Sequence, residues 1–235
     1  MRNSETKVDR RLTASSVPAV LVLLGAAAIA GAGSPAVAAE PAGATQPAAA
    51  TQIDAATQIH AQRIAVAVCG TCHGQQGNST QPKFPRLAGQ HANYLAAQLK
   101  AFRSQSRGDP DAIGYMWGMA AELDDDTIAA LAAYYAAQKP ESGPRADQAA
   151  ITRGREIYDH GITAEGVPAC SSCHGADAHG TQDYPRLAGQ HEQYVLKQLG
   201  SFQSNMRNVA IMHGVALNLR SPEMQSVAAY LQSQP

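Results

Sequence analysis

Aromatic side chains are scarce in this sequence: three Phe, one Trp and eight Tyr make up 5% of its 235 residues. Such side chains normally supply much of the bulk of a hydrophobic core, so we expect another large apolar group to fill part of it. The sequence also lacks a block of Lys or Arg, and its formal net charge is −1, which excludes the electrostatic footprint of a nucleic-acid-binding protein. With 45% apolar and 16% charged residues, the chain is neither a disordered polyelectrolyte nor a multi-span membrane protein.

The N-terminal segment has the pattern of a secretory signal peptide. A basic stretch ends at Arg11, residues 12–39 carry no charge, and the small residues Ala36-Val37-Ala38 supply a cleavage site. We therefore expect residues 1–38 to be removed on export, and residues 39–52, rich in Ala, Pro and Thr, to form a tail. An uncleaved anchor is the alternative, although the apolar run is shorter than a continuous span of about 20 residues.

Only four cysteines are present, and an even number in an exported protein first suggests disulfides. Their spacing favours another chemistry, because each pair is a C-x-x-C followed at once by His, the attachment signature of haem c. Two thiols three residues apart on a helical turn can add to the two vinyl groups of one haem, and the next imidazole then faces the iron. A thioredoxin-like pair would need a βαβ context, and a zinc site would need ligands from pairs 101 residues apart. The two pentapeptides are Cys69-Gly-Thr-Cys72-His73 and Cys170-Ser-Ser-Cys173-His174.

We therefore predict two covalently attached haem c groups. Four thiols attach them, and one histidine after each pair is an axial ligand of the iron. The attaching residues are Cys69, Cys72, Cys170 and Cys173, and the axial histidines are His73 and His174.

The chain contains an internal repeat. Residues 84–99 recur at an offset of 100 as residues 184–199, and both copies contain Pro-Arg-Leu-Ala-Gly-Gln-His. Each half is therefore a complete module. Shorter matches follow in the same order, 116–123 with 212–219 and 131–135 with 227–231.

The module boundaries follow from composition. We expect the first module to span residues 53–139 and the second to span residues 147–235. Residues 140–146 form a linker that contains Pro140 and Pro144. Because this linker is short, we expect the two modules to pack together.

Both modules are predicted to be helical. Apolar residues recur at helical spacing over residues 91–102 and 191–202. The last helix of each module has a start signal, Asp124 as N-cap in the first and Ser221 as N-cap before Pro222 in the second. No strand alternation competes, so the predicted fold is all-α, with two tandem helical domains each built around one covalent haem c. Without haem, such small modules would bury a poor core.

The second axial position of each iron separates an electron carrier, which fills it, from a catalyst, which leaves it open. Four methionines lie near the right place: Met116 and Met119 in the first module, Met206 and Met212 in the second. Only Met116 and Met212 align with each other, whereas the other two face Val215 and Ser106 in the opposite module. We therefore predict Met116 and Met212 as axial ligands, although core filling is the ordinary role of a methionine. The alternative ligands are His91, His191 and His213.

At these residues the chain resembles class I cytochromes c, and over residues 60–235 it resembles the di-haem cytochrome c4 family. C-x-x-C-H, P-x-L-x-G-Q, M-x-G-(M/V)-A and a terminal helix with (A/S)-Y all occur twice, in order. The resemblance implies that the carbonyl of Pro85 accepts the Nδ1–H of His73, and that Pro185 does so for His174. A carbonyl acceptor of this kind fixes the ring tautomer and raises the basicity of the ligand.

Two details of the repeat stay open. The first module lacks the Gly-x-x-x-aromatic pattern that Gly154 and Tyr158 supply in the second. Arg86 and Arg186, in the repeated Pro-Arg-Leu segment, either neutralise a haem propionate or remain solvated charges.

The resemblance implies electron transfer by two low-spin haems, with no substrate transformed, so the protein is not expected to be an enzyme. It implies a periplasmic carrier, or a membrane-associated shuttle, between a bc1-type donor and a terminal oxidase. One alternative is a di-haem electron-transfer subunit of a periplasmic dehydrogenase. Another is a di-haem peroxidase or thiosulfate-oxidising enzyme, which would need an open or labile iron. The two matched methionines argue against that last class.

Overall fold

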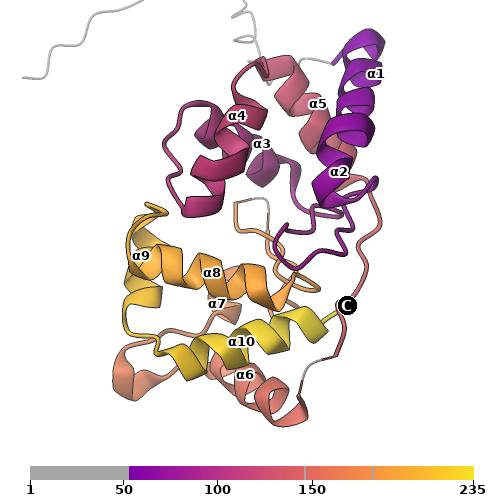
Figure 1. Cartoon of the computed structure of the whole chain (residues 1–235). Coiled ribbons are helices and arrows are strands. Elements are labelled where there is room, and N and C mark those ends of the chain that lie inside the picture. Colours follow the sequence, from indigo (N-terminus) through magenta and orange to yellow (C-terminus); the bar gives the residue numbers. More distant parts are fainter. Residues whose placement is uncertain (1–52, 146, 182) are drawn as a thin grey trace, which may run out of the picture. The chain divides into compact units, whose positions relative to one another are not determined.

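The computed structural model describes residues 53–145, 147–181 and 183–235. The predicted signal peptide over residues 1–38 and the predicted tail over residues 39–52 lie outside the described residues. All regular elements of the described residues are helical, apart from one isolated bridge between Ile162 and Val167 (Figure 1). The all-α prediction is therefore confirmed. None of the described helices combines the length and the apolar character needed to cross a membrane.

The first half of the described chain is a group of helices assembled around the last of them. Helices α1 and α3 both pack against α5, and α3 also contacts α4. Two short π-helical turns, η1 and η2, interrupt the regular helices. The elements are α1 (Ala55–Ile64), η1 (Ala65–Cys69), α2 (Gly70–His73), α3 (Ala92–Arg103), η2 (Ala112–Met116), α4 (Trp117–Ala120) and α5 (Asp125–Ala136).

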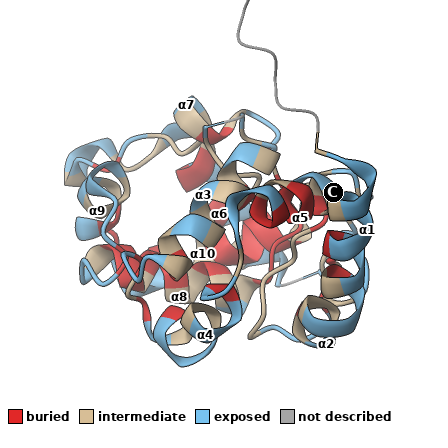
Figure 2. Ribbon diagram, turned by 90° about the horizontal axis from the view of Figure 1, so that it is seen from above, coloured by how far each residue is buried: buried red, intermediate tan, exposed pale blue. Residues whose placement is uncertain are grey.

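The second half has the same plan. Its last helix, α10, packs against both α6 and α8, and α8 contacts α9. Among the helices, α5, α8 and α10 carry the most buried residues (Figure 2). The elements are α6 (Gln148–His160), η3 (Thr163–Glu165), α7 (Ser171–His174), α8 (Glu192–Gln203), α9 (Ala210–Leu217) and α10 (Ser221–Ser233).

The predicted helix starts are confirmed in one terminal helix and wrong in the other. Asp124 is the N-cap of α5, and its carboxylate accepts the Thr127 N–H at 2.7 Å. Ser221 is not the N-cap of α10, because Arg220 holds that position and Ser221 is the first helical residue. The extended backbone ends at Arg220, so Ser221 already lies inside the helix, and no side chain caps the N-terminus of α10. The Arg220 guanidinium donates to Glu223 of the first turn at 2.7 Å, but a guanidinium cannot accept from the free N–H groups.

The first and last helices of each module cross closely, by different means. A methyl group on Gly154 of α6 would lie 1.9 Å from the Ser226 carbonyl oxygen of α10, so only glycine permits this crossing. In the first module, Ala61 and Ala65 are 1% and 0% exposed where α1 meets α5. The hydroxyl of Tyr135 donates to the Ala65 carbonyl at 3.2 Å. Small alanines one turn apart therefore take the place of the glycine.

Both halves belong to one compact unit and contact each other through the loops that precede α3 and α8. The ring Nε2 of His91 donates to the carbonyl of His179 at 2.8 Å, and that of His191 donates to the carbonyl of Ser79 at 2.8 Å. The expectation that the two halves pack together is therefore confirmed.

Candidate haem-binding sites

Each C-x-x-C-H pentapeptide forms a single helical turn, α2 in the first half and α7 in the second. Cys72 and Cys173 lie within these turns, Cys69 and Cys170 directly precede them, and none of the four is in a disulfide. Burial raises the pKa of Cys170 to about 11 and also raises that of Cys69. Gly74 and Gly175 end the two turns at φ of 78° and 79°, a conformation that favours glycine.

The histidine of each pentapeptide is buried and oriented by a proline carbonyl. His73 is 7% exposed and its Nδ1–H donates to Pro85 at 2.8 Å. His174 is 6% exposed and its Nδ1–H donates to Pro185 at 3.1 Å. These bonds fix the tautomer in which Nε2 carries the lone pair that a metal needs. Burial lowers the pKa of both rings, against the proline bonds, which raise it, so both imidazoles are neutral.

An aromatic side chain covers each of these imidazoles. The rings of Phe84 and His73 meet edge to face with centroids 6.1 Å apart, and those of Tyr184 and His174 with centroids 6.0 Å apart. Sequence reasoning had assigned these two aromatics no role. The signal that could have found them is their place directly before the repeated proline in both copies.

The structure separates the four methionines into two kinds. Met116 packs against the buried cluster of Phe102, Ala112 and Ala120, and Met212 packs against the core of the second half. The other two face solvent, with Met119 58% and Met206 53% exposed. Their truncation is therefore a natural control for the aligned pair.

The two π-helical turns of the first half end at residues that the sequence predicts to bind haem. The turn η1 ends at Cys69, and η2 ends at Met116. Such turns widen a helix by one residue, and they are frequent at functional sites because they redirect the side chains that follow.

The three alternative histidine ligands make other hydrogen bonds. His91 and His191 use Nε2 to bind loop carbonyls of the opposite half, as described above. The Nδ1–H of His213 donates to the Phe202 carbonyl at 2.8 Å, which ties α9 to α8. These bonds give each of the three rings a structural role.

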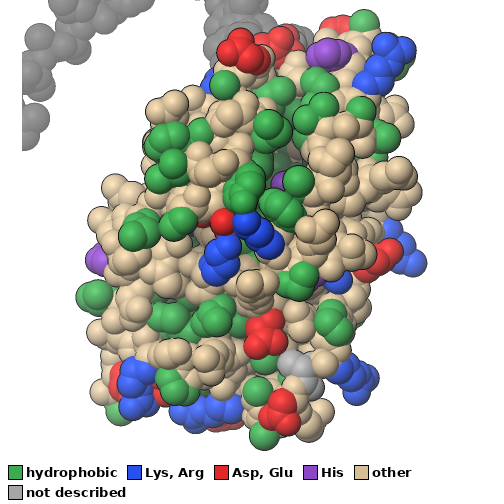
Figure 3. Space-filling model, viewed as in Figure 1, with side chains coloured by type: hydrophobic (Ala, Val, Ile, Leu, Met, Phe, Trp, Pro, Cys, Tyr) green, Lys and Arg blue, Asp and Glu red, His purple; other side chains and the backbone are tan. Residues whose placement is uncertain are grey.

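Two features of the structure fit a large apolar group that carries carboxylates, as haem does. The Nε atoms of Arg186 and Arg207 are buried donors without a partner, each of which costs about 1–3 kcal/mol unless an acceptor such as a propionate is supplied. Val66 and Val68, close to Cys69 in the chain, are 42% and 47% exposed apolar side chains. Figure 3 shows a recess in the first half, bordered by hydrophobic side chains and with a histidine at its edge.

The two arginines of the repeated Pro-Arg-Leu segment are not equivalent. The guanidinium of Arg86 donates to the carbonyls of Glu141 at 2.6 Å and Gly189 at 3.2 Å, so it holds the backbone between the halves. It is thus not simply a solvated charge. Arg186 uses Nη2 on the Pro235 carbonyl at 2.6 Å and leaves its buried Nε for an acceptor.

Comparison with known proteins agrees with this geometry. The cytochrome c family model matches residues 58–138 and again residues 151–235. Cytochrome c-552 of Acidithiobacillus ferridurans is 44% identical over 169 residues, which are 70% of this chain and 73% of that protein. A protein of Thiomonas intermedia named thiosulfate dehydrogenase electron acceptor is 35% identical over 176 residues, 72% of this chain and 79% of its own.

A solved structure, that of cytochrome c4 from Acidithiobacillus ferrooxidans, aligns with a TM-score of 0.67 at 43% identity. It covers 70% of this chain and 98% of its own length. A family match over both halves, each with its own C-x-x-C-H, implies two covalently bound haem c groups. The chain therefore belongs to the cytochrome c family, as a di-haem electron-transfer protein similar to cytochrome c4.

Proposed function

We propose that this protein is an exported electron carrier in which each haem iron has one histidine and one methionine as axial ligands. The ligand pairs are His73 with Met116 and His174 with Met212. One observation carries the proposal. In both halves, a buried histidine held by a proline carbonyl is matched by a partly buried methionine at the aligned position, while the unaligned methionines face solvent.

When bound, haem supplies an iron that alternates between the ferrous and ferric states. The chain sets how readily it does so. The carbonyls of Pro85 and Pro185 orient the imidazoles and make them better donors, and the soft thioethers favour the ferrous state. With both axial positions filled, neither iron would have a position open to a substrate, which supports the role of a carrier over that of an enzyme.

The proposal extends to organisation and place in the cell. Residues 1–38 are a signal peptide, residues 39–52 a tail, and the mature chain works in the periplasm. Its modules are residues 53–139 and 147–235, joined by the linker 140–146. A bc1-type complex is the electron donor and a terminal oxidase is the electron acceptor. The protein attaches peripherally to the membrane as it carries electrons from one to the other.

A second donor is supported by a specific similarity. The Thiomonas relative is named as the electron acceptor of thiosulfate dehydrogenase, and it aligns over both modules of this chain. A periplasmic dehydrogenase of this kind is therefore the alternative electron donor.

Carbon monoxide tests the carrier function directly. The reduced protein should not bind it at either iron, because a bound thioether occupies each sixth position. Binding at one haem of the unaltered protein would refute the proposal and favour an enzyme. The donor is tested separately by mixing the oxidised protein with a bc1-type complex and quinol, or with thiosulfate dehydrogenase and thiosulfate. The donor is the enzyme that reduces both haems faster.

A further inference from the structure

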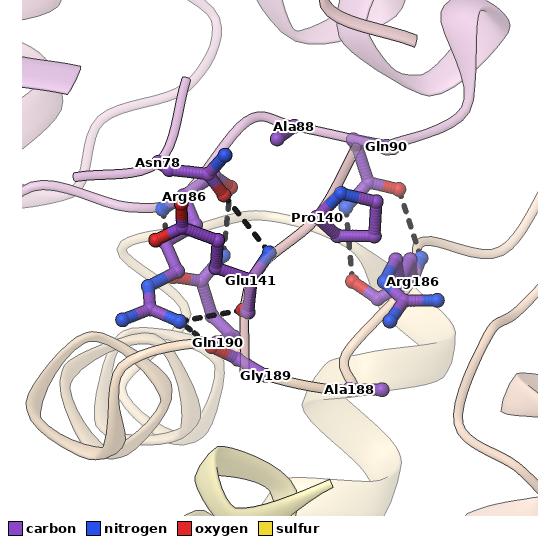
Figure 4. A pocket seen from close by; sticks show the side chains of 10 residues that line it. All are labelled: Asn78, Arg86, Ala88, Gln90, Pro140, Glu141, Arg186, Ala188, Gly189 and Gln190. Atoms are coloured by element: carbon purple, nitrogen blue, oxygen red, sulfur yellow. Dashed lines mark hydrogen bonds between the residues drawn. The ribbon is translucent and has the colours of Figure 1, made fainter. Parts of the chain in front are cut away.

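Two glutamines cross between the modules and bind the opposite backbone in the same way (Figure 4). Gln190 accepts the N–H of Arg86 through Oε1 at 2.9 Å and donates from Nε2 to the Arg86 carbonyl at 2.9 Å. Gln90 binds Arg186 likewise, at 2.8 Å and 2.9 Å. Both glutamines are buried, with 6% of Gln90 and 7% of Gln190 exposed, so water does not compete for these bonds.

These bonds end on the peptide groups that hold the axial histidines. The Arg86 N–H and the Pro85 carbonyl belong to one peptide group, and that carbonyl accepts from His73 at 2.8 Å. A continuous hydrogen-bonded chain therefore runs from His73, through one peptide group, to Gln190 of the other module. The mirror chain runs from His174, through the Pro185–Arg186 peptide group, to Gln90.

Hydrogen bonds in such a chain strengthen one another. When the N–H of a peptide group donates to a glutamine oxygen, the group is polarised and its carbonyl becomes a better acceptor. A better acceptor draws more strongly on the imidazole Nδ1–H and raises the basicity of Nε2 toward a metal. The effect is larger where the local dielectric is low, and both glutamines have little contact with solvent.

We propose that Gln190 is a positioning residue for His73 and that Gln90 is a positioning residue for His174, each acting across the module interface. The inference rests on the proposed ligation by the two histidines. It means that the ligand strength at each iron is set partly by the other module, so that native properties of either haem require docked modules.

The test exchanges each glutamine for methionine, which has similar bulk but no amide. In the reduced protein labelled with ¹⁵N-histidine, Gln190→Met should shift the ring N–H signal of His73 upfield and leave that of His174 in place. Gln90→Met should do the reverse. The reduction potential should rise for the same haem whose histidine signal moves, because a weaker imidazole donor stabilises the ferric state less.

Asn78→Ala is the matched control, since Asn78 lies beside the same arginines but binds only Lys139 and Glu141. It should move neither histidine signal. The proposal is overturned if a signal moves in the module that carries the mutation, if both signals move equally, or if neither moves. Should one glutamine variant fail to fold, the mirror variant still decides. If His73 and His174 are not axial ligands at all, the unaltered protein itself should lack a low-spin haem spectrum, which distinguishes that failure from a failure of this proposal.

Discussion

Replacing Met116 or Met212 by alanine tests the feature on which the carrier function depends. Oxidised haem with a methionine ligand has a weak near-infrared band from sulfur-to-iron charge transfer. Two irons contribute to it, so each single substitution should remove half of the band and the double substitution all of it. The iron that loses its sulfur should bind water when oxidised and carbon monoxide when reduced.

The structure also predicts the cost in stability and supplies the control. Met116 is partly buried against Phe102 and Ala120, so its truncation should destabilise by about 1–2 kcal/mol from packing alone, less than for a fully buried methionine. Met119 is 58% exposed and Met206 53% exposed. Truncating either of them should change the free energy of unfolding by less than about 0.5 kcal/mol and leave the band intact.

The assay is near-infrared absorption of the oxidised variants, with thermal unfolding followed in parallel. A lower melting temperature with an unchanged band in Met116→Ala would mean that this methionine only fills the core. Loss of the band in Met119→Ala or Met206→Ala would show that alignment of the repeat had selected the wrong sulfur.

Three further outcomes are expected. After denaturation and acid–acetone extraction the chain should retain two haems, and a count of one, or extractable haem, would contradict covalent attachment at both motifs. Gly154→Ala should lower the free energy of unfolding by about 1–3 kcal/mol or more, because the added methyl group would overlap the Ser226 carbonyl oxygen. Gly200→Ala, in open space on α8, should instead raise it by about 0.5–1 kcal/mol, and equal effects would refute the argument from close crossing. Burial alone would raise the pKa of Asp109, but Arg107, 2.7 Å away, holds it below its ordinary value. As pH falls, the Asp109 carboxylate of the unfolded chain therefore becomes protonated before that of the folded protein. The stabilisation from the Arg107–Asp109 pair is complete above the pKa that Asp109 has in the unfolded chain. It is lost as pH falls through the lower pKa that Asp109 has in the folded protein. Asp109→Asn should make acid unfolding less steep below about pH 4, and an unchanged pH profile would refute the linkage.

Local pattern predicted the helices well and their caps less well. The helices expected over residues 91–102 and 191–202 are Ala92–Arg103 and Glu192–Gln203 in the structure. Asp124 caps α5 as expected, because a carboxylate next to free N–H groups acts locally. The predicted N-cap of α10 was wrong because the extended backbone ends at Arg220, one residue before Ser221, and no side chain caps this helix.

Contacts between distant residues lay beyond sequence reasoning. The role of Arg86 was missed because its acceptors, Glu141 and Gly189, are 55 and 103 residues away in the chain. The same holds for Gln190, whose partner Arg86 is 104 residues away. Both residues were visible in the sequence as part of the repeat, but nothing in the repeat shows that one copy binds the other.

The sequence by itself determined the chemistry of this protein: two C-x-x-C-H motifs, two aligned methionines and a duplicated helical module. These follow from short spacings, which a single helical turn converts into geometry. Only the tertiary structure decided which methionines are partly buried and which face solvent, and how α1 and α6 pack. It also decided that the histidine of each C-x-x-C-H motif is linked through one peptide group to the opposite module. The physical reason is that such contacts depend on how two folded surfaces meet, and a directed hydrogen bond between them exists only once both modules have formed and docked.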